Sequence, residues 1–428
     1  MIKEGTYWHP ETETMSRDKL LEYQWSKVLP QLHYAYRNVP YYRKSFDKAG
    51  IKISKIKTVE DYYENVPFLS KIQIIENQKT NPPFGDLLGV KPEDLCRIYI
   101  APGPLALPFT KEEYDVLTSM LAKGFYTCGA RERDIVDITA NFHWVIAGTA
   151  FDEAFRRIGC GVLPGGPGMS NMHIEMMKLT KATVLMGFTM FVLKLGEAAR
   201  EMGIDPSSEL SLRLIVVAGD VRTEDTKAKL EKTFGAEVRE VYGTADIGLI
   251  AAECPDGGGM HLYEEILVEV IDPETAKHVP TGEGGEIVAS DIARKAMPII
   301  RYRTGDITEG LNLDPCPCGR STPRLKRILG RVSDIAKVKG MFVNPSEVEG
   351  VIKRHPELDR FQIIVDRPEL MDELTIKVEF NRPVDKGKME RSLADELKEV
   401  IRLKSNVVLV EEGTIPKDAG VLDDRRKV

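Results

Sequence analysis

The stretch 212-LRLIVVAGD-220 decides the fold. Its uninterrupted apolar run, ending in a glycine, is typical of a strand that is buried on both faces of a sheet. Four further runs have the same character: 134-DIVDITA-140, 160-CGVLPGG-166, 182-ATVLMG-187 and 237-EVREVYG-243. Helical patterns separate them at 111–128, 145–158, 171–180, 190–203 and 223–234. This alternation predicts an α/β fold, with a parallel sheet, helices on both faces and ligands beyond the carboxyl ends of the strands.

Composition excludes several classes of protein. The 428 residues are 42% hydrophobic and 29% charged, which is ordinary for a globular chain. The net charge of −7 argues against nucleic acid or an anionic membrane as the main partner, because both select basic surfaces. No apolar run approaches the length of a membrane span, and MIKEGTYWHP is not a signal-peptide pattern. Six cysteines are too few for a disulfide scaffold, so we expect a reduced, cytoplasmic protein.

Outward from the parallel region, the pattern changes at both ends. Residues 16–38 read as an amphipathic helix that Pro30 kinks or splits. Residues 262–310 are antiparallel in character, and the segments after residue 334 follow the order β-α-β-β-α-β. We therefore expect a large N-terminal domain over 1–328 and a small α+β domain over 329–428.

Three motifs point to one family when they are taken together. They are 241-VYGTADIGLIAAEC-254, 301-RYRTGDIT-308 and 330-GRVSDIAKVKGMFVNPSEVE-349. In this order and spacing, the chain resembles the phenylacetate–CoA ligase-like branch of the adenylate-forming acyl- and aryl-CoA ligases along nearly its whole length. The resemblance implies an N-terminal AMP-binding domain and a mobile C-terminal lid. It also implies a reaction with ATP, magnesium and CoA, in which a carboxylate becomes an acyl-adenylate and then a thioester.

The resemblance also implies roles for particular residues. Asp306 would accept hydrogen bonds from the ribose hydroxyls, a task that suits an ionised carboxylate. Tyr242 would stack on adenine, Asp246 would help to hold magnesium, and Arg331 would approach the nucleotide when the domains close. The complete set of expected nucleotide-binding residues is Gly219, Asp220, Tyr242, Gly243, Thr244, Asp306 and Arg331. Asp246 and Arg331 are the weak candidates for catalysis.

Three features depart from the family pattern in the half of the site that would handle ATP. Relatives carry a Ser/Thr/Gly-rich loop before the helix start, where this chain reads 98-IYIAPGPLALPFTKEEY-114. Its loop would have few donors, apolar side chains that fill space or line a pocket, and at best a nest of backbone N–H groups at Gly103, Leu105, Ala106 and Leu107.

The C-terminal stretch 415-IPKDAGVLDDRRKV-428 lacks the lysine turn of relatives, and Ser333 stands where they usually have aspartate. Lys417, Arg425 or Lys427 could replace that lysine in space. Our hypothesis is that adenylation from ATP is lost or much weakened.

Two further sets of residues are candidate sites. Cys254, His261, Cys316 and Cys318 offer three thiolates and an imidazole, a complete tetrahedral set for structural zinc. Buried thiols or a transient disulfide are the alternatives. The expected acyl pocket would be shaped by Phe142, His143, Trp144, Gly165 and Gly166.

Three functions are consistent with these patterns. The first is an aryl- or acyl-CoA ligase. The second is an ATP-independent homologue that binds acyl-CoA or AMP-type ligands and acts on a thioester or as a subunit of a complex. The third is a zinc-stabilised binding protein without catalysis. The expected partner under the first two is a small acyl, aromatic-acid or CoA ligand, and a homodimer or a place in a larger complex is compatible with the sequence. The sequence does not define the acyl group.

Overall fold

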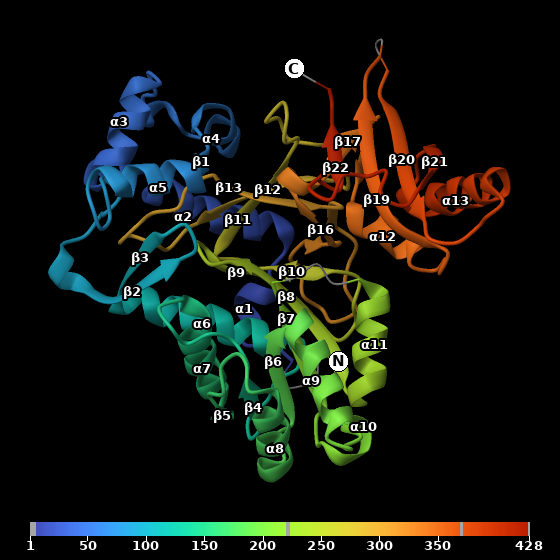
Figure 1. Ribbon diagram of the computed structural model, residues 1–428. Coiled ribbons are helices and arrows are strands. Elements are labelled where there is room, and N and C mark those ends of the chain that lie inside the picture. The colour runs from blue at the N-terminus through green and yellow to red at the C-terminus, as the bar shows by residue number, and fades with distance from the viewer. Residues whose placement is uncertain (1–5, 220–222, 369–370, 427–428) are drawn as a thin grey trace. The chain divides into compact units, whose positions relative to one another are not determined.

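The computed structural model describes residues 6–219, 223–368 and 371–426 (Figure 1). The chain divides into two compact units. The first comprises residues 1–304 and 308–328, and the second comprises residues 305–307 and 329–428. No helix in the described ranges is long and apolar enough to span a membrane.

A nine-stranded sheet forms the centre of the first unit, in the order β14-β15-β10-β9-β8-β7-β6-β4-β5. Strands β4 to β8 are parallel, and β9, β10, β15 and β14 continue the sheet antiparallel. The strands are β4 (Ile135–Ile138), β5 (Gly161–Leu163), β6 (Val184–Phe188), β7 (Leu214–Ala218), β8 (Glu237–Thr244), β9 (Gly248–Glu253), β10 (Met260–Leu262), β14 (Leu311–Asn312) and β15 (Arg324–Leu325). The five parallel strands coincide with the five predicted runs.

Helices cover both faces of this sheet, as the apolar runs predicted. Alternate residues of β7 belong to different cores: Val216 lies in the larger one, and Ile215 and Val217 lie in the smaller one. Helices α6 and α7 pack on the first face, and α8, α9 and α11 pack on the second. Their bounds are α6 (Lys111–Cys128), α7 (Ile146–Ile158), α8 (Ser170–Thr180), α9 (Thr189–Glu201), α10 (Pro206–Glu209) and α11 (Glu224–Phe234).

A group of helices precedes the sheet. Helix α2 (Arg17–Asn38) contains Pro30 and is not split by it. Ser16 caps this helix by accepting a hydrogen bond from the Lys19 N–H. The others are α1 (Pro10–Glu13), α3 (Pro40–Lys48), α4 (Val59–Asn65) and α5 (Lys71–Thr80).

A second sheet is mostly antiparallel, which agrees with the pattern of residues 262–310, and its residues 305–307 and 329–331 belong to the second unit. It has the order β1-β13-β12-β11, and β16 pairs with β13. Its strands are β1 (Leu69–Ser70), β11 (Ile266–Ile271), β12 (Gly285–Asp291), β13 (Tyr302–Thr308) and β16 (Ile328–Arg331).

The second unit has its own core and a four-stranded sheet in the order β21-β20-β19-β22. Its strands are β19 (Leu358–Asp366), β20 (Glu373–Phe380), β21 (Asn406–Glu411) and β22 (Leu422–Asp424), with α12 (Pro345–Ile352) and α13 (Lys386–Ile401) packed against them. A hairpin of β17 (Ala336–Val338) and β18 (Met341–Val343) completes this α+β unit.

Candidate functional site

The segment expected to be a phosphate loop is a closed β-hairpin. Strand β2 (Leu95–Ala101) pairs antiparallel with β3 (Leu105–Thr110), and Ala101 stands opposite Leu105, so only three residues make the turn. The prediction of a loop through 105–109 was therefore wrong. The side chains of Leu105, Leu107 and Phe109 are buried in the core. They fill space there, which was one of the two roles expected for the apolar side chains of this segment.

Backbone groups of the paired strands in this hairpin already have partners. Gln78 on α5 is buried and accepts a hydrogen bond from the Ala106 N–H at 2.8 Å, and its amide donates to the Ala106 carbonyl at 2.8 Å. Leu105 and Leu107 lie in the ladder opposite Ala101 and Tyr99. The proposed nest of free N–H groups is therefore not formed, because at least the Ala106 donor already has a partner.

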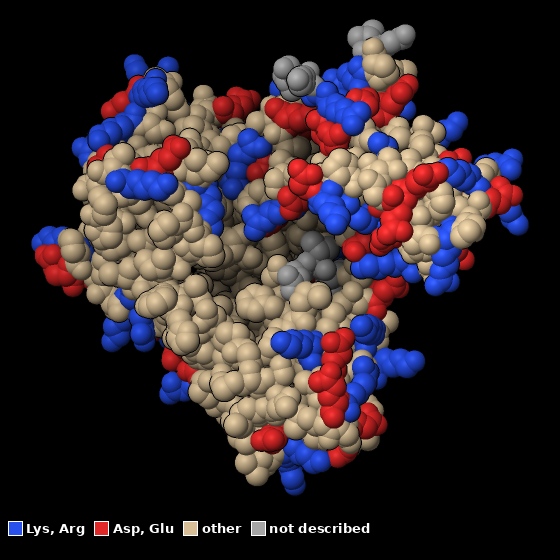
Figure 2. Space-filling view, viewed as in Figure 1, with Lys and Arg blue, Asp and Glu red and all other residues tan. Residues whose placement is uncertain are grey.

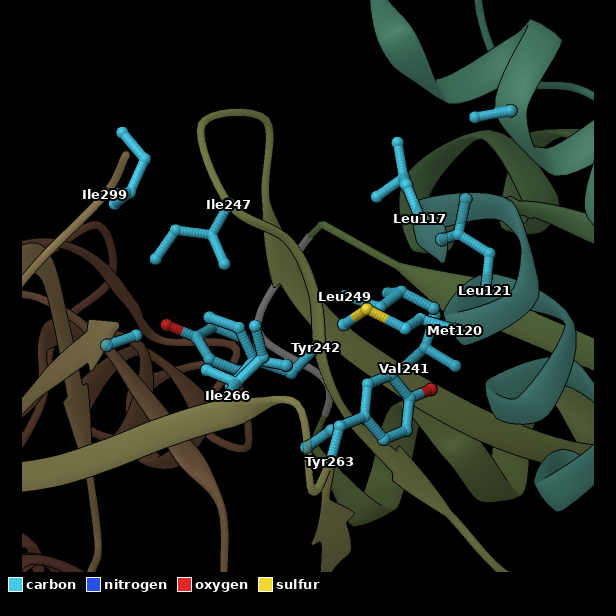
Figure 3. Packing of buried hydrophobic residues seen from close by; sticks show 14 of the residues in the cluster. Leu117, Met120, Leu121, Val241, Tyr242, Ile247, Leu249, Tyr263, Ile266 and Ile299 are labelled. Atoms are coloured by element: carbon cyan, nitrogen blue, oxygen red, sulfur yellow. The ribbon is translucent and has the colours of Figure 1, made fainter. Parts of the chain in front are cut away.

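The YGTAD motif spans the end of β8 and the turn after it. Tyr242 is buried in the main core, in the same cluster as Ile247 and Ile266 (Figure 3), and its hydroxyl lies 3.5 Å from the Thr304 hydroxyl. The Thr244 hydroxyl accepts a hydrogen bond from the Ile247 N–H at 3.2 Å. Stacking on adenine needs an open ring face, so this role of Tyr242 stays a prediction.

Asp246 is buried at the end of this motif. Its Oδ2 accepts a hydrogen bond from the Tyr302 hydroxyl at 2.5 Å and lies 3.6 Å from the Lys71 ammonium. Its Oδ1 has no hydrogen-bond partner among the described residues. The Arg294 guanidinium, stacked on Phe109, donates to the Asp246 carbonyl at 2.5 Å. The carboxylate thus faces neighbouring side chains, and its expected contact with magnesium stays a prediction.

Gly219 ends β7 with a φ of 86°, a left-handed conformation that favours glycine. A Cβ there would lie 2.5 Å from the Phe188 ring, so the close approach of β6 also requires glycine. The expected partner in this turn, Asp220, lies outside the described residues.

In the second unit, Asp306 and Arg331 are partners. The Arg331 Nε lies 2.8 Å from the Asp306 Oδ1, and the arginine side chain is 57% exposed while the aspartate is nearly buried. A ribose would share or displace this exposed guanidinium to reach the carboxylate. Ser333 lies in the short helix after Arg331 and donates to Asp334 at 2.7 Å.

The C-terminal segment is held close to the small sheet. Glu379 accepts a hydrogen bond from the Ile415 N–H at 2.6 Å, and Arg360 donates to the Ile415 carbonyl at 2.8 Å. Of the three cations that could replace the lysine, Lys417 is exposed and Arg425 lies 2.7 Å from Asp423. Lys427 lies outside the described residues.

The residues of the expected acyl pocket separate into two groups. Phe142 lies beside Gly166, whose Cβ would be 3.8 Å from the Phe142 ring, and Gly165 adjoins it in the same loop. His143 is exposed and Trp144 is 81% exposed, with a φ of 58°. Phe142, Gly165 and Gly166 therefore come together, whereas the two exposed rings do not enclose a slot with them.

The Cys/His cluster (Cys254, His261, Cys316 and Cys318) is assembled as the sequence predicted. The four ligand atoms lie within 4.8 Å of one another. The Cys254 and Cys316 sulfurs are 3.6 Å apart, and the Cys318 sulfur is 3.3 Å from the His261 Nε2. Tetrahedral zinc with ordinary bond lengths requires about 3.8 Å between sulfurs and about 3.5 Å between sulfur and nitrogen. The donor set and its spacing therefore fit this ion.

The surroundings of the cluster favour metal binding. Hydrogen bonds from Cys254 and His261 lower the pKa of Cys318 well below its ordinary value, which favours the thiolate that binds metals. The other ring nitrogen of His261 lies 3.2 Å from the Thr322 hydroxyl, a contact that orients the ring.

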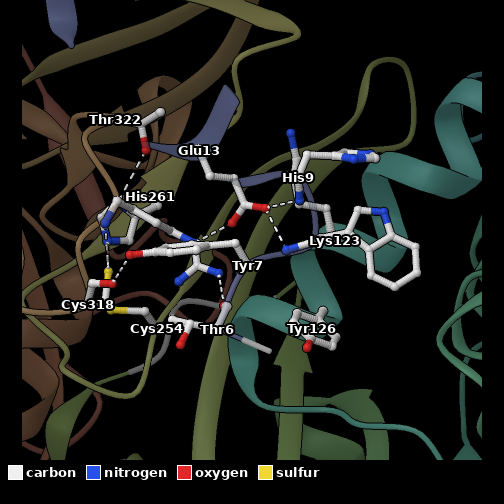
Figure 4. A network of polar contacts seen from close by, with 12 residues as sticks. Thr6, Tyr7, His9, Glu13, Lys123, Tyr126, Cys254, His261, Cys318 and Thr322 are labelled. Atoms are coloured by element: carbon white, nitrogen blue, oxygen red, sulfur yellow. Dashed lines mark hydrogen bonds and ion pairs between the residues drawn. The ribbon is translucent and has the colours of Figure 1, made fainter. Parts of the chain in front are cut away.

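The chain's first described residues are tied to this cluster (Figure 4). The Tyr7 hydroxyl donates to the Cys318 carbonyl at 2.8 Å. The Arg320 Nε lies 2.7 Å from the buried Glu13 carboxylate, which also accepts the N–H groups of Trp8 and His9. Sequence patterns could not indicate these contacts, because they join residues about 300 positions apart.

Comparison with known proteins identifies the family of this chain. The AMP-binding enzyme profile matches residues 114–293, and the profile of the AMP-binding enzyme C-terminal domain matches residues 340–425. The chain belongs to this adenylate-forming family of AMP-binding enzymes.

Within the family, it is similar to phenylacetate–coenzyme A ligases. It is 29% identical to that of a Thermus thermophilus strain over 92% of this chain and 88% of the relative. It is 26% identical to that of Escherichia coli, over 95% and 94%. Its fold matches an open conformation of 2-hydroxyisobutyryl-CoA ligase, with a TM-score of 0.88 over 99% of this chain and 95% of the other, at 24% identity.

Proposed function

We propose that this protein transfers an acyl group between AMP and the thiol of coenzyme A, and that it forms acyl-adenylate from ATP weakly or not at all. In the transfer, the thiol sulfur bonds to the acyl carbon and the acyl–phosphate oxygen bond breaks. AMP leaves, and the thiol proton passes to solvent. The family of the chain and its similarity to CoA ligases support the acyl and CoA chemistry.

One observation carries the loss of the ATP step. The Leu95–Thr110 hairpin closes in three residues, and Gln78 takes the Ala106 N–H. Catalysis of phosphoryl and adenylyl transfer depends on donors and cations that stabilise the charge on the phosphates. A closed hairpin with buried leucines offers neither to a triphosphate.

Asp306 and Arg331 support retention of an AMP-type ligand. The carboxylate accepts from an exposed guanidinium, and ribose hydroxyls make the same kind of hydrogen bond to an ionised aspartate. The expected ligand set remains Gly219, Asp220, Tyr242, Gly243, Thr244, Asp306 and Arg331. We further propose that the second unit, residues 329–428 in the main, acts as the mobile lid.

Two assays on the same preparation test this proposal. In the first, pyrophosphate-dependent exchange of label into ATP is followed with a panel of aromatic and aliphatic acids, and we expect none above background. In the second, synthetic phenylacetyl-AMP and CoA are supplied, and we expect thioester and AMP in equal amounts. Exchange at an ordinary ligase rate would contradict the loss of adenylation, and absence of thioester with every acyl-AMP would contradict the transfer.

A complete aryl- or acyl-CoA ligase is the second candidate. The match along almost the whole length of phenylacetate–CoA ligases favours it. Phe142, Gly165 and Gly166 would then contact the acyl group, and magnesium and ATP would be required. The exchange assay separates the two candidates directly.

We also propose that the Cys/His cluster holds structural zinc, which would tie the loop after β9 to the segment after β14. Four protein ligands leave no open position, so the ion would stabilise structure and take no part in catalysis. Metal analysis of freshly purified, unchelated protein tests this, with one zinc per chain expected. A protein that holds zinc yet binds neither AMP nor CoA in calorimetry would fit the third function, a binding protein without catalysis.

A further inference from the structure

A small pocket lies at the carboxyl ends of β4 and β5. Its volume is about 200 Å³. Its wall is largely apolar and includes Leu163 at the end of β5, Met169 at the N-cap of α8, and Met172 and Met176 within α8. Figure 2 shows mostly uncharged side chains over this part of the first unit. In parallel α/β sheets this edge is where ligands bind.

A charged pair forms the polar side of the pocket. Asp137 is only 1% exposed, and its Oδ2 lies 2.7 Å from the His173 Nδ1. The other nitrogen of His173 lies 2.8 Å from the Gly166 carbonyl. These two acceptors hold the ring as an imidazolium, which agrees with the raised pKa of His173. The pair is therefore a carboxylate and an imidazolium with no net charge.

One oxygen of this pair is available to a ligand. Asp137 Oδ1 makes no hydrogen bond to the residues that the structure describes, and it lies beside Gly165, which also lines the pocket. A Cβ on Gly165 would come within 3.1 Å of this oxygen and 2.3 Å of the His173 ring, so glycine keeps the space open. A ligand that donates to this oxygen would gain a hydrogen bond to a charged acceptor, which is stronger than one to a neutral acceptor.

We propose that this pocket is a subsite for a short or branched aliphatic group that carries a hydroxyl. The methionine and leucine side chains contact the aliphatic part, and methionine adapts readily to irregular shapes. The hydroxyl donates to Asp137 Oδ1. A neutral donor suits the site better than an ammonium group, because an ammonium would place an uncompensated charge in an apolar pocket. The inference does not depend on the loss of adenylation.

Two natural ligands carry this chemistry. One is a hydroxylated aliphatic acyl group of the substrate, and the other is the dimethylated, hydroxyl-bearing arm of coenzyme A. Both present a branched aliphatic group with a hydroxyl donor. A competition experiment is therefore needed to distinguish the two ligands.

Ligand-observed NMR with 3-methyl-1-butanol as the probe tests the proposal, and its methyl ether is the matched control. The ether keeps the aliphatic group and has no proton to donate. We expect the wild-type protein to bind the alcohol at least about tenfold more tightly than the ether, as a hydrogen bond to a charged acceptor requires. Equal binding of the alcohol and the ether would contradict recognition of the hydroxyl. No binding of the alcohol would contradict the proposed subsite as a whole.

A pair of variants places the signal in this pocket. Met172→Trp fills the pocket from its rim, where Met172 is 49% exposed, so the change does not disturb the core. Met190→Trp adds the same ring at a methionine that is 66% exposed on α9 and does not line the pocket. We expect the first to abolish the alcohol signal and the second to leave it unchanged. Retention of the signal in Met172→Trp would overturn the proposal.

Competition with coenzyme A and with 2-hydroxyisobutyrate then identifies the source. Displacement of the alcohol by coenzyme A assigns the pocket to the cofactor arm, and displacement by the hydroxy acid assigns it to the acyl group. The readout is binding alone, so its failure is distinct from a failure of the acyl-transfer assays.

Discussion

The Cys/His cluster and the Leu95–Thr110 hairpin differ in how their polar groups are satisfied. In the cluster, four ligand atoms from three segments converge within 4.8 Å, and Thr322 and Tyr7 hold the ligand segments from outside. In the hairpin, Gln78 and the opposite strand take the backbone groups, and buried side chains fill the remaining space. A convergent set of donors indicates a ligand, whereas groups that satisfy one another indicate a closed structural element.

Removal of one cluster ligand should have the largest effect on stability. Cys254→Ser should abolish zinc binding and lower the free energy of unfolding by about 4 kcal/mol, the contribution of a ligand present at a thousand times its Kd. Metal analysis and urea unfolding measure the two effects. Cys96→Ser is the matched control, because Cys96 is exposed and outside the cluster. Full zinc content in Cys254→Ser would show that Cys254 is not a zinc ligand and would contradict the contrast between the cluster and the hairpin.

Loss of the buried Gln78 amide should destabilise the hairpin. Gln78→Leu leaves the N–H and carbonyl of Ala106 buried without their partner, which should cost about 3 kcal/mol in unfolding free energy. Lys79→Leu changes an exposed neighbour on the same helix and should change stability little. If Gln78→Leu proved as stable as the control, the hairpin's groups would not be held as described.

Asp306 should decide binding of AMP. Asp306→Ala removes the acceptor for the ribose hydroxyls and should weaken AMP binding at least about 100-fold, because two hydrogen bonds to a charged group are lost. Calorimetry measures this effect. Asp423→Ala is the control, since Asp423 pairs with Arg425 in the same unit. Unchanged AMP affinity in Asp306→Ala would remove the assigned ligand role.

The smallest effect should be a pH dependence from His173. Its pKa is raised in the folded protein by the hydrogen bond and charge of Asp137 and by the Gly166 carbonyl, against the opposing effect of burial. A raised pKa stabilises the fold below the unfolded value near 6.5, and this contribution is lost as pH rises through the folded value. The stability difference between the wild type and His173→Gln should therefore shrink from pH 6 to pH 9, and urea unfolding at the two pH values measures it. A stability difference that grows with pH would contradict the assignment of His173 as an imidazolium in the folded protein.

The fold could be predicted from local patterns because those patterns determine it. The five apolar runs became β4 to β8, and helix α6 has the predicted bounds of 111–128. The convergence of the cluster could be predicted from its residue types, since three cysteines and a histidine are a typical donor set for a metal ion. In both cases the chemistry of the residues was sufficient.

The remaining features depend on contacts between distant residues. Prolines suggested a loop at 102–109, and only the pairing with β2 and the amide of Gln78 made this segment a strand. The contact between Glu13 and Arg320 carried no signal, because Glu13 lies in no motif and the two residues are 307 positions apart. Asp137 could have been noticed, since a carboxylate inside an apolar strand run requires a buried partner, and here that partner is His173.

The comparison of ATP with AMP in one calorimetric titration tests the central claim most directly. Because Gln78 takes the Ala106 N–H and buried side chains fill the hairpin, we expect AMP to bind and ATP to bind no more tightly, with or without magnesium. Binding of ATP more than about tenfold tighter than AMP, a difference of about 1.4 kcal/mol, would show that the triphosphate is recognised and would contradict the account.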